Sequence, residues 1–396
     1  MKKTILTLVM SASIMFTMAA DLYVNGSGNA NTYPTIQGAV NASSSGDNIY
    51  VATVGTYSEN VTITNKSLFI IAAVADEEFT LSGSFTLSPG TGNEVTIIGM
   101  YNGNVTCSGY GTSNLISSFI SSISGSSSGG KLNVYDCEVT NSFTIYNGSV
   151  KGNVIDRLVV NSASGANGDT IRIMGNYMTS LDWNSSMAYF EICNNYINGI
   201  ASNSYASRPV TIDYLQTTPG GTNLIANNTI DASVSSTSSS YGAIVFGANS
   251  TVQNGQNLVV VNNYLKNSYS TNYNAYAINS SYDISNALIA NNQYYFYNFS
   301  NNTSNSTLVD NGTSAVNWIY SATTGVLTSG SNMGLDQIEY RDINNTRNDI
   351  GTSGGPHAWS NYNTTTGKAA VFNLELPFQL YIGGNHNIKA KGFHKN

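Results

Sequence analysis

The feature that most constrains the fold is a five-residue pattern that recurs five times between residues 174 and 294. Each copy has an apolar or small residue, then usually two Asn residues, a variable residue and an apolar residue. The second Asn residues of successive copies are 19, 33, 35 and 29 positions apart. A structural turn of about 20 residues, lengthened by loops of different size, explains these spacings and indicates a solenoid. The copies are MGNYM at 174–178, CNNYI at 193–197, ANNTI at 226–230, VNNYL at 261–265 and ANNQY at 290–294.

The order of residues within each copy predicts which side chains face the interior. Alternate residues of a strand share a face, so we expect Cys193, Asn195 and Ile197 to point inward together. A buried Asn alone is costly, but stacked strands would place equivalent amides roughly 4.8 Å apart, where each can bond the next. Asn also tolerates the left-handed backbone that a sharp corner requires. A surface Asn-Asn-Tyr turn is the alternative. The predicted structural ladder consists of Asn176, Asn195, Asn228, Asn263 and Asn292.

Short apolar runs of strand length precede these copies and are rich in β-branched residues, for example at 61–63, 95–98 and 143–145. No long helical pattern separates them, which argues against a doubly wound α/β sheet. Charged residues make up only 9% of the chain, against about 25% in average proteins. The 41% hydrophobic content nevertheless supplies the apolar area that disordered chains lack. We therefore predict an all-β, single-stranded right-handed parallel β-helix.

The two ends of the chain differ from its middle. Residues 1–20 have the basic start, apolar stretch and small final residues of a bacterial secretory signal peptide. Residues 21–45 are expected to form an N-terminal cap with a short helix, because Ile36, Ala39 and Val40 have helical spacing. Residues 46–335 are predicted to form the β-helix. Residues 336–396 are predicted to form a closing loop and a C-terminal β-hairpin that turns at 383–385.

Charge and cysteine content narrow the range of partners. The net charge is −7 and no basic stripe runs through the chain, so we expect no nucleic-acid partner. The three cysteines, Cys107, Cys137 and Cys193, are an odd number at wide spacing and give neither a disulfide framework nor a zinc pattern. We expect them to be buried as small apolar residues, and we predict no metal site.

Two stretches resemble the pectin-lyase-like superfamily of right-handed parallel β-helix proteins. The first is TIQGAV at 35–40 followed by GDNIYV at 46–51 and GTYSENV at 55–61, which is similar to the opening of that superfamily. The second is RDINNTRNDIG at 341–351 followed by GGP at 354–356, which resembles a closing motif of secreted bacterial β-helix proteins. The resemblance implies the fold, but this fold carries lyases, hydrolases, adhesins and structural proteins. Asn344 and Asn345 replace an acidic residue and Gly of many relatives, so no metal role is assigned to that loop.

The repeated pattern also predicts a binding surface. If the second Asn faces inward, then Tyr177, Tyr196 and Tyr264 face outward from equivalent positions, with Thr229 and Gln293 in the same column. Aromatic faces on a nearly uncharged surface suit neutral sugar rings, while Asn and Ser side chains bond sugar hydroxyls. The alternative is that Tyr occurs here because it favours strands.

Catalysis is the rival hypothesis. Family lyases need a base together with a cation such as Ca²⁺ or an Arg, and family hydrolases need paired carboxylates. The best candidates are Asp156, Asp169, Arg172 and Asp182, within a region that continues to Glu191, Arg208 and Asp213. Ordinary surface ion pairs are the alternative reading of these residues.

The leading functional prediction is a secreted or cell-surface protein with a structural, adhesive or carbohydrate-binding role. Its expected partner is an extracellular polysaccharide or a cell-surface glycan, with self-assembly left open, and no cofactor is expected. Ice binding would need a regular Thr array over many turns. The Thr-x-Thr step at Thr62 and Thr64 does not persist along the sequence, so ice binding is not favoured.

Overall fold

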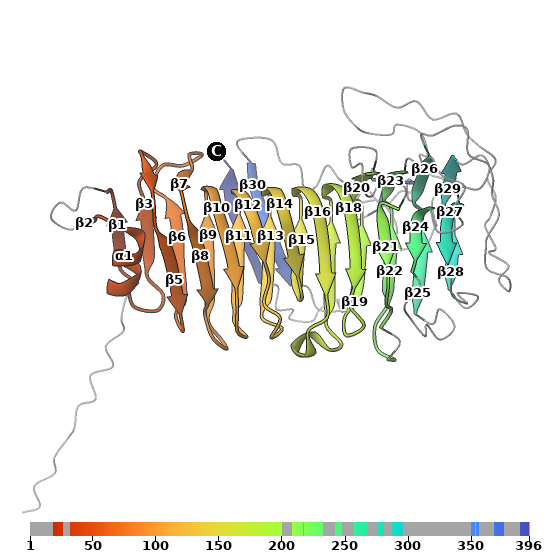
Figure 1. The fold of residues 1–396 in the computed structure, drawn as a ribbon, viewed down its shortest axis with the longest axis horizontal. Coiled ribbons are helices and arrows are strands. Elements are labelled where there is room, and N and C mark those ends of the chain that lie inside the picture. The colour runs from red at the N-terminus through yellow and green to blue at the C-terminus, as the bar shows by residue number, and fades with distance from the viewer. Residues whose placement is uncertain are drawn as a thin grey trace, which may run out of the picture.

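The computed structural model confirms the predicted right-handed parallel β-helix (Figure 1). Each turn of the chain places one strand in a 13-stranded sheet, here sheet A, and then one long strand or two short ones in a 16-stranded sheet, sheet B. All strand pairs within the two sheets are parallel, for example β17 with β19 and β14 with β16. The structure describes residues 19–26, 32–199, 208–216, 218–232, 242–247, 257–267, 276–280, 287–295, 350–352, 354–355, 368–375 and 389–395.

Sheet A begins inside the predicted N-terminal cap, because β1 pairs with β3. In chain order its strands are β1 (Asp21–Val24), β2 (Thr32–Tyr33), β3 (Asn48–Val51), β6 (Leu68–Ala72), β9 (Glu94–Ile98), β11 (Thr112–Ile116), β13 (Lys131–Tyr135), β15 (Gly148–Lys151), β17 (Thr170–Met174), β19 (Tyr189–Cys193), β22 (Asn223–Ala226), β25 (Leu258–Val261) and β28 (Leu288–Ala290).

Sheet B has two faces that meet at a corner, and five long strands span that corner. The long strands are β10 (Met100–Cys107), β12 (Phe119–Ser124), β14 (Glu138–Ile145), β16 (Val154–Asn161) and β18 (Tyr177–Asn184). The short strands before the corner are β4 (Thr56–Tyr57), β7 (Phe79–Leu81), β20 (Tyr196–Asn198), β23 (Thr229–Ala232), β26 (Tyr264–Asn267) and β29 (Gln293–Tyr295). Those after it are β5 (Asn60–Thr64), β8 (Ser84–Ser88), β21 (Val210–Ile212), β24 (Gly242–Phe246) and β27 (Tyr276–Ser280).

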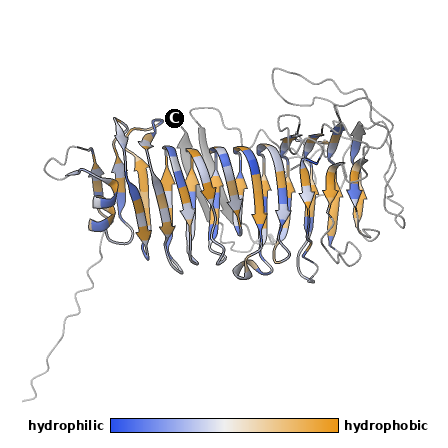
Figure 2. Cartoon of the chain, in the orientation of Figure 1, coloured by the Kyte–Doolittle hydropathy of each residue, from blue (hydrophilic) through white to orange (hydrophobic). Residues whose placement is uncertain are grey.

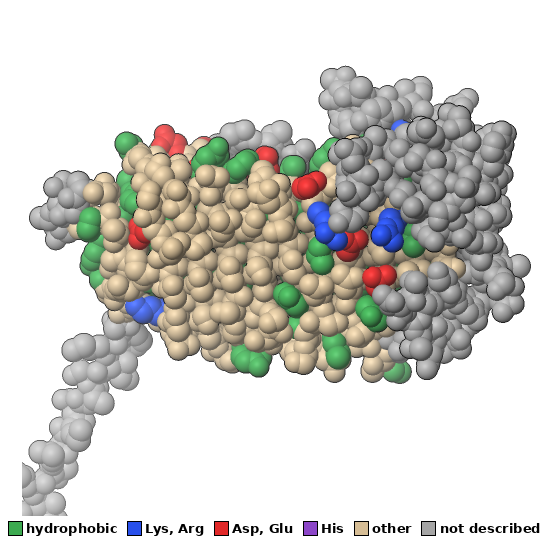
Figure 3. Space-filling model, in the orientation of Figure 1, with side chains coloured by type: hydrophobic (Ala, Val, Ile, Leu, Met, Phe, Trp, Pro, Cys, Tyr) green, Lys and Arg blue, Asp and Glu red, His purple; other side chains and the backbone are tan. Residues whose placement is uncertain are grey.

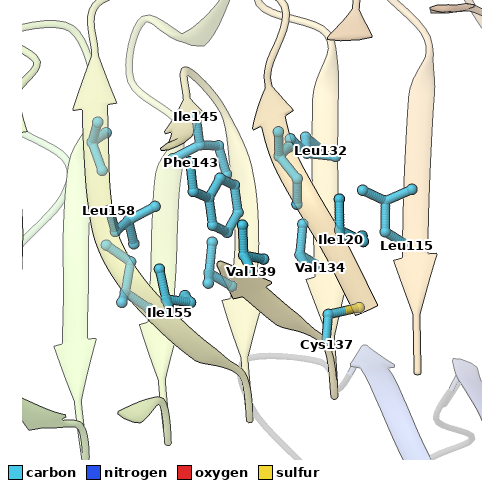
Figure 4. Packing of buried hydrophobic residues seen from close by; sticks show 14 of the residues in the cluster. Leu115, Ile120, Leu132, Val134, Cys137, Val139, Phe143, Ile145, Ile155 and Leu158 are labelled. Atoms are coloured by element: carbon cyan, nitrogen blue, oxygen red, sulfur yellow. The ribbon is translucent and has the colours of Figure 1, made fainter. Parts of the chain in front are cut away.

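Alternate residues of each strand fill one continuous core between the sheets. In one turn, Leu132 and Val134 of sheet A and Phe143 and Ile145 of sheet B are at most 1% exposed and point toward one another (Figure 4). Hydrophobic residues run through the strands along the solenoid, with hydrophilic residues between them (Figure 2). The core therefore grows along one axis by stacking and does not widen, as expected for a repeat fold.

The turn from sheet A to sheet B explains the Asn-Asn pattern. Its first residue has a left-handed backbone, with φ of 57° at Asn194 and 56° at Asn227. Asn tolerates this conformation better than other residues with a Cβ. Gly occupies the same position at Gly152 and Gly175, where φ is 68° and 61°. The pattern is therefore a corner residue followed by a buried residue, and Gly or Asn serves at the corner.

The predicted Asn ladder is confirmed and has one more member, Asn153. Each Nδ2 except that of the last member, Asn292, donates to the Oδ1 of the next Asn at 2.9–3.0 Å. Each Nδ2 also donates to a main-chain carbonyl of the neighbouring turn at 2.8–3.0 Å. All six side chains are at most 2% exposed, so the buried amides satisfy one another. The ladder consists of Asn153, Asn176, Asn195, Asn228, Asn263 and Asn292.

The predicted direction of Cys193 is wrong. Ile192 belongs to the main core, whereas Cys193 packs on the opposite face of sheet A in a separate cluster with Met174 and Ala226. The left-handed residue Asn194 interrupts strand alternation, so the residues before and after the corner need not share a face. All three cysteines are free and buried, as expected, and burial raises the pKa of the Cys107 thiol to about 12.

The predicted cap helix is confirmed as α1 (Ile36–Ala42). The Glu59 carboxylate accepts the main-chain N–H groups of Ile36 and Gln37 at 2.7 and 2.9 Å, which satisfies the start of the helix. The Gln37 side chain then bonds the first edge of sheet B. Its Oε1 accepts Thr62 N–H at 2.6 Å and its Nε2 donates to Thr62 O at 3.3 Å.

A closing segment, residues 350–352 and 354–355, lies against the corner turns of later rungs. Asn194 Nδ2 donates to the carbonyls of Thr352 and Gly354 at 3.2 and 2.5 Å. Gly351 N–H donates to Asn262 O at 2.9 Å. The first Asn of two of the pairs therefore has a second use, since the side chains of Asn194 and Asn227 donate to this segment. The closing-motif residues Asp342, Arg347 and Asp349 lie outside the described residues.

The predicted C-terminal hairpin is present as β30 (Lys368–Glu375) and β31 (Lys389–Lys395), which pair antiparallel. The predicted turn at 383–385 and the predicted signal peptide, up to residue 18, lie outside the described residues. Within the part of the chain that the structure describes, no helix has the length and hydropathy needed to cross a bilayer.

Candidate functional site

An outward-facing column of aromatic residues runs along the first face of sheet B. Tyr101 stacks on Phe119 of the next turn, with ring centroids 4.9 Å apart and planes 25° apart. Further along, Tyr177 lies beside Tyr196, with centroids 5.4 Å apart and planes 45° apart. Strand register places all of them in one column, which we call the aromatic column. Its successive positions are Tyr101, Phe119, Glu138, Val154, Tyr177, Tyr196, Thr229, Tyr264 and Gln293.

Tyr177, Tyr196 and Tyr264 lie at equivalent positions of the column, as predicted. They differ in how much of each side chain is exposed to a ligand. Tyr177 and Tyr196 are half-buried, whereas Tyr264 is 3% exposed. The closing segment lies at this point, since Thr352 N–H donates to the Thr229 hydroxyl at 3.3 Å in the same column. Tyr264 is therefore a packing residue and does not offer a binding face, which corrects the prediction.

The structure adds Tyr101 and Phe119, which the sequence pattern missed. Tyr101 is 42% exposed. The corner residues before these two positions are Gly99 and Ser117, both with positive φ, so the equivalent turn was present without its Asn-Asn sequence. A sequence pattern that allowed Gly or Ser, as well as Asn, at the left-handed corner residue would have identified Tyr101 and Phe119.

The stacked rings also limit how a sugar could bind. Tyr101 and Phe119 stack, so each of these two rings keeps at most one free face together with its edge, whereas the Tyr177 and Tyr196 rings are tilted against each other. Polar groups lie close by: Asn198 Nδ2 donates to the Tyr177 hydroxyl at 3.2 Å, and Asn141 Nδ2 donates to Ser121 Oγ at 3.0 Å. Contact with a ligand therefore combines ring edges and free faces with uncharged hydrogen-bonding groups.

The four alternative catalytic residues do not form one site. Asp156 and Asp182 belong to β16 and β18 of sheet B, whereas Arg172 belongs to β17 of sheet A and Asp169 immediately precedes that strand. The outer faces of the two sheets lie on opposite sides of the core. These side chains therefore do not meet, although the residues are close in sequence. This corrects the interpretation of the region as one active site.

Each of these residues has its own local partner. Arg172 Nε donates to Glu191 Oε2 at 2.8 Å, and Asn147 Nδ2 donates to Asp169 Oδ2 at 2.8 Å. The Thr179 hydroxyl donates to Asp156 Oδ1 at 2.9 Å. The surface ion-pair interpretation therefore describes the Arg172–Glu191 pair, whose side chains are 47% and 30% exposed.

One acidic pair on sheet B has an unusual environment. Asp182 is 9% exposed, and Arg157 Nε donates to its Oδ2 at 2.8 Å. Burial, and then the nearby Asp182 charge, raise the pKa of Asp213 despite the opposing charge of Arg208. The buried hydroxyl of Ser180, on the same strand as Asp182, has no hydrogen-bond partner among the described residues. This group is the only one among the sequence candidates in which the charge of one carboxylate raises the pKa of another.

Charge is otherwise sparse on the described surface. On the face shown in Figure 3, most side chains are neither charged nor hydrophobic, and most of the charged ones gather right of centre. Within the described ranges, no three His, Cys, Asp or Glu side chains are grouped so as to hold a metal ion.

The fold and this surface define the chain as a parallel β-helix with an outward aromatic column. Comparison of the chain with protein-family models, with curated proteins and with solved structures gives no match.

Proposed function

We propose that this chain is a secreted or cell-surface bacterial β-helix of the pectin-lyase-like type that binds a neutral extracellular polysaccharide without cleaving it. The observation that carries the proposal is the aromatic column, with two ring pairs aligned along the solenoid axis. A glycan chain lying along that axis would meet one column position per turn, at roughly 4.8 Å intervals. Aromatic contacts and neutral hydrogen-bonding groups are the chemistry that sugars require.

The candidate catalytic side chains already have hydrogen-bond or ion-pair partners, which favours binding over catalysis. A lyase or hydrolase needs a base or an acid that is free to exchange a proton with substrate. Arg157 and Arg172 are each occupied by a carboxylate, and Asp156 accepts a hydroxyl. The aromatic column itself contains one ionisable carboxylate, Glu138, which is a weak basis for chemistry on a polysaccharide.

Affinity electrophoresis tests the proposal with neutral polysaccharides, such as a β-glucan and a mannan, beside anionic pectate and alginate. We expect retardation by a neutral polymer and none by the anionic ones. Tyr177→Ala and Tyr196→Ala should each weaken binding by roughly 2- to 10-fold, since an aromatic contact contributes about 0.5–1.5 kcal/mol. Tyr110→Ala is the matched control, because Tyr110 is 66% exposed and lies outside the column. The assignment of the aromatic column as the binding site would be contradicted if Tyr110→Ala weakened glycan binding equally. It would also be contradicted if the Tyr177 and Tyr196 variants bound glycan as well as the wild type.

Hydrolysis at Asp182 and Asp213 is the second candidate, and the raised pKa of Asp213 beside Asp182 favours it. A carboxyl whose pKa is raised next to a second carboxylate is the arrangement that general-acid catalysis of glycoside hydrolysis uses. Incubation of the protein with the same polysaccharides, followed by an assay for new reducing ends, separates the two functions. Release of reducing ends that is lost in Asp213→Asn would establish the hydrolase and reject the non-catalytic proposal.

A further inference from the structure

The second face of sheet B presents a regular array of hydroxyl and amide groups. Its central column holds one Thr or Ser in each of five successive turns, aligned by strand register without a gap. These residues point outward, because their neighbours in the same strands, such as Val61, Phe85 and Phe143, are fully buried. The central column is Thr62, Thr86, Thr106, Ser124 and Thr144.

Two flanking columns extend the array on either side. Register aligns Asn60, Ser84, Asn104 and Ser122 before the central column, and Ser142 holds this position in the fifth turn. Thr64 pairs with Ser88 after it, and Ser108 continues this column on the next turn. We call all of these residues the hydroxyl array. None of its members is charged or aromatic, and each is exposed or half-buried.

The array repeats in two directions. Adjacent turns are roughly 4.8 Å apart, and alternate residues along a strand are about 6.6 Å apart. The strands that carry the array lie side by side along the straight body of the solenoid (Figure 1). The backbone beneath is held by fully buried core residues, and β-branched Thr side chains have restricted χ1 rotation. The hydroxyls are therefore fixed in a lattice.

The size and charge of the array restrict its occupant. Five turns and three columns cover roughly 250 Å², whereas a standard protein interface covers about 800 Å² on each partner. A second protein is therefore a poor match. The absence of any charged side chain from the array favours a neutral occupant, and its two-dimensional repeat favours one that is itself periodic.

The sequence did not favour ice binding, because the Thr-x-Thr step at Thr62 and Thr64 does not recur along the chain. The regular column of Thr and Ser forms only between turns, through strand register. We therefore propose, against that first expectation, that the hydroxyl array binds the surface of ice. In ice, neighbouring oxygens are about 2.8 Å apart, a normal O–H···O distance, and tetrahedral geometry then places next-nearest oxygens about 4.5 Å apart. That spacing is close to the distance between turns of the solenoid. Ice is neutral, and its surface offers donors and acceptors in equal measure, as do the Ser, Thr and Asn side chains. Crystalline polysaccharide is the less suitable occupant, because this face has none of the aromatic rings that lie on the first face of sheet B.

Thermal hysteresis and ice-crystal shape, measured on the secreted chain, test this proposal. We expect the wild-type protein to depress the freezing point below the melting point and to facet growing crystals. Thr86→Lys and Thr106→Lys, at the centre of the array, should abolish both effects. Thr80→Lys is the matched control, since Thr80 lies in the same turn as Thr86 but in line with the aromatic column. Thr86→Val and Thr86→Ser, which alter the array least, should each weaken hysteresis without loss of folding, checked by circular dichroism.

Several outcomes would overturn the proposal. These are a wild-type protein without hysteresis or crystal shaping, or hysteresis that survives both Lys variants. Binding to crystalline cellulose or chitin that is lost in Thr86→Lys, without any effect on ice, would assign the array to a polysaccharide. The result is separable from the proposed glycan binding, because Tyr177→Ala should leave hysteresis unchanged and Thr86→Lys should leave soluble-glycan binding unchanged.

Discussion

The Oδ1 atom of Asn228 accepts two hydrogen bonds from Asn195, one from its side-chain Nδ2 and one from its main-chain N–H, both at 2.9 Å. The side chain of Asn228 therefore completes the hydrogen bonding of the turn before it. The same arrangement repeats through the ladder, so each Asn is a link between two turns.

Substitution of one ladder residue should be strongly destabilising. In Asn228→Ala, both Asn195 donors lose this acceptor in a buried site, at a cost of roughly 1–3 kcal/mol for each unsatisfied donor. We expect a clear fall in melting temperature, measured by circular dichroism. Asn141→Ala is the control, because Asn141 makes an exposed side-chain bond and should change stability by less than about 0.5 kcal/mol. Equal melting temperatures for the two variants would show that the ladder does not stabilise the stack.

The ladder should be extendable toward the N-terminus at Cys137. Cys137 occupies the ladder position one turn before Asn153, and its N–H donates to Asn153 Oδ1 at 2.8 Å. In Cys137→Asn the new Nδ2 would meet the same Oδ1, while its own Oδ1 would face the turn that carries Ser118. We expect Cys137→Asn to be as stable as the wild type or more so.

Cys137→Ser is the comparison for this prediction, since it supplies a shorter polar group that cannot span the interval between turns. The melting temperature should follow the order Asn above Ser. The reverse order would mean that the ladder cannot be continued past Asn153.

The edge of sheet B should depend on Gln37. Its side chain bonds both main-chain groups of Thr62, which would otherwise form an open strand edge that can pair with another chain. Gln37→Ala should leave β5 open and increase aggregation, measured by light scattering over a concentration series. Gln37→Glu keeps the acceptor for Thr62 N–H but loses the donor, so it should aggregate at an intermediate level. Unchanged scattering for Gln37→Ala would mean that α1 alone protects the edge.

The closing segment should depend on Asn194. Asn194→Gly removes both side-chain bonds to residues 352 and 354 but keeps the left-handed backbone available. We expect faster proteolysis around residues 350–355 with little change in the circular dichroism spectrum. Asn194→Ala removes the same bonds and adds backbone strain of about 1–2 kcal/mol, so it should also lower the melting temperature. If both variants melt alike, then the corner tolerates Ala and the strain argument fails.

The Asn pattern was readable from sequence because a buried amide needs a partner, and a repeated one implies an identical partner in the next turn. Asn153 was missed because its corner residue is Gly152 instead of Asn, although Gly152-Asn153 repeats the arrangement of Gly175-Asn176. The inward direction of Cys193 was misjudged because strict alternation does not continue through a left-handed residue.

The candidate sites were harder to predict because they depend on neighbours in different turns. Arg172 and Asp182 are ten positions apart in sequence but belong to different sheets. Thr62 and Thr86 are 24 positions apart and lie side by side. The residues around each pair do not reveal that the first pair is separated and that the second pair is adjacent.

The sequence by itself determined the order of strands, corners and buried amides along the chain, because strand alternation and left-handed corners are properties of a few consecutive residues. Only the tertiary structure decided which outward side chains form columns, and it did so through the loop lengths between turns and the packing of each turn on the last. The aromatic column, the burial of Tyr264 and the hydroxyl array all follow from that register, which no single turn encodes.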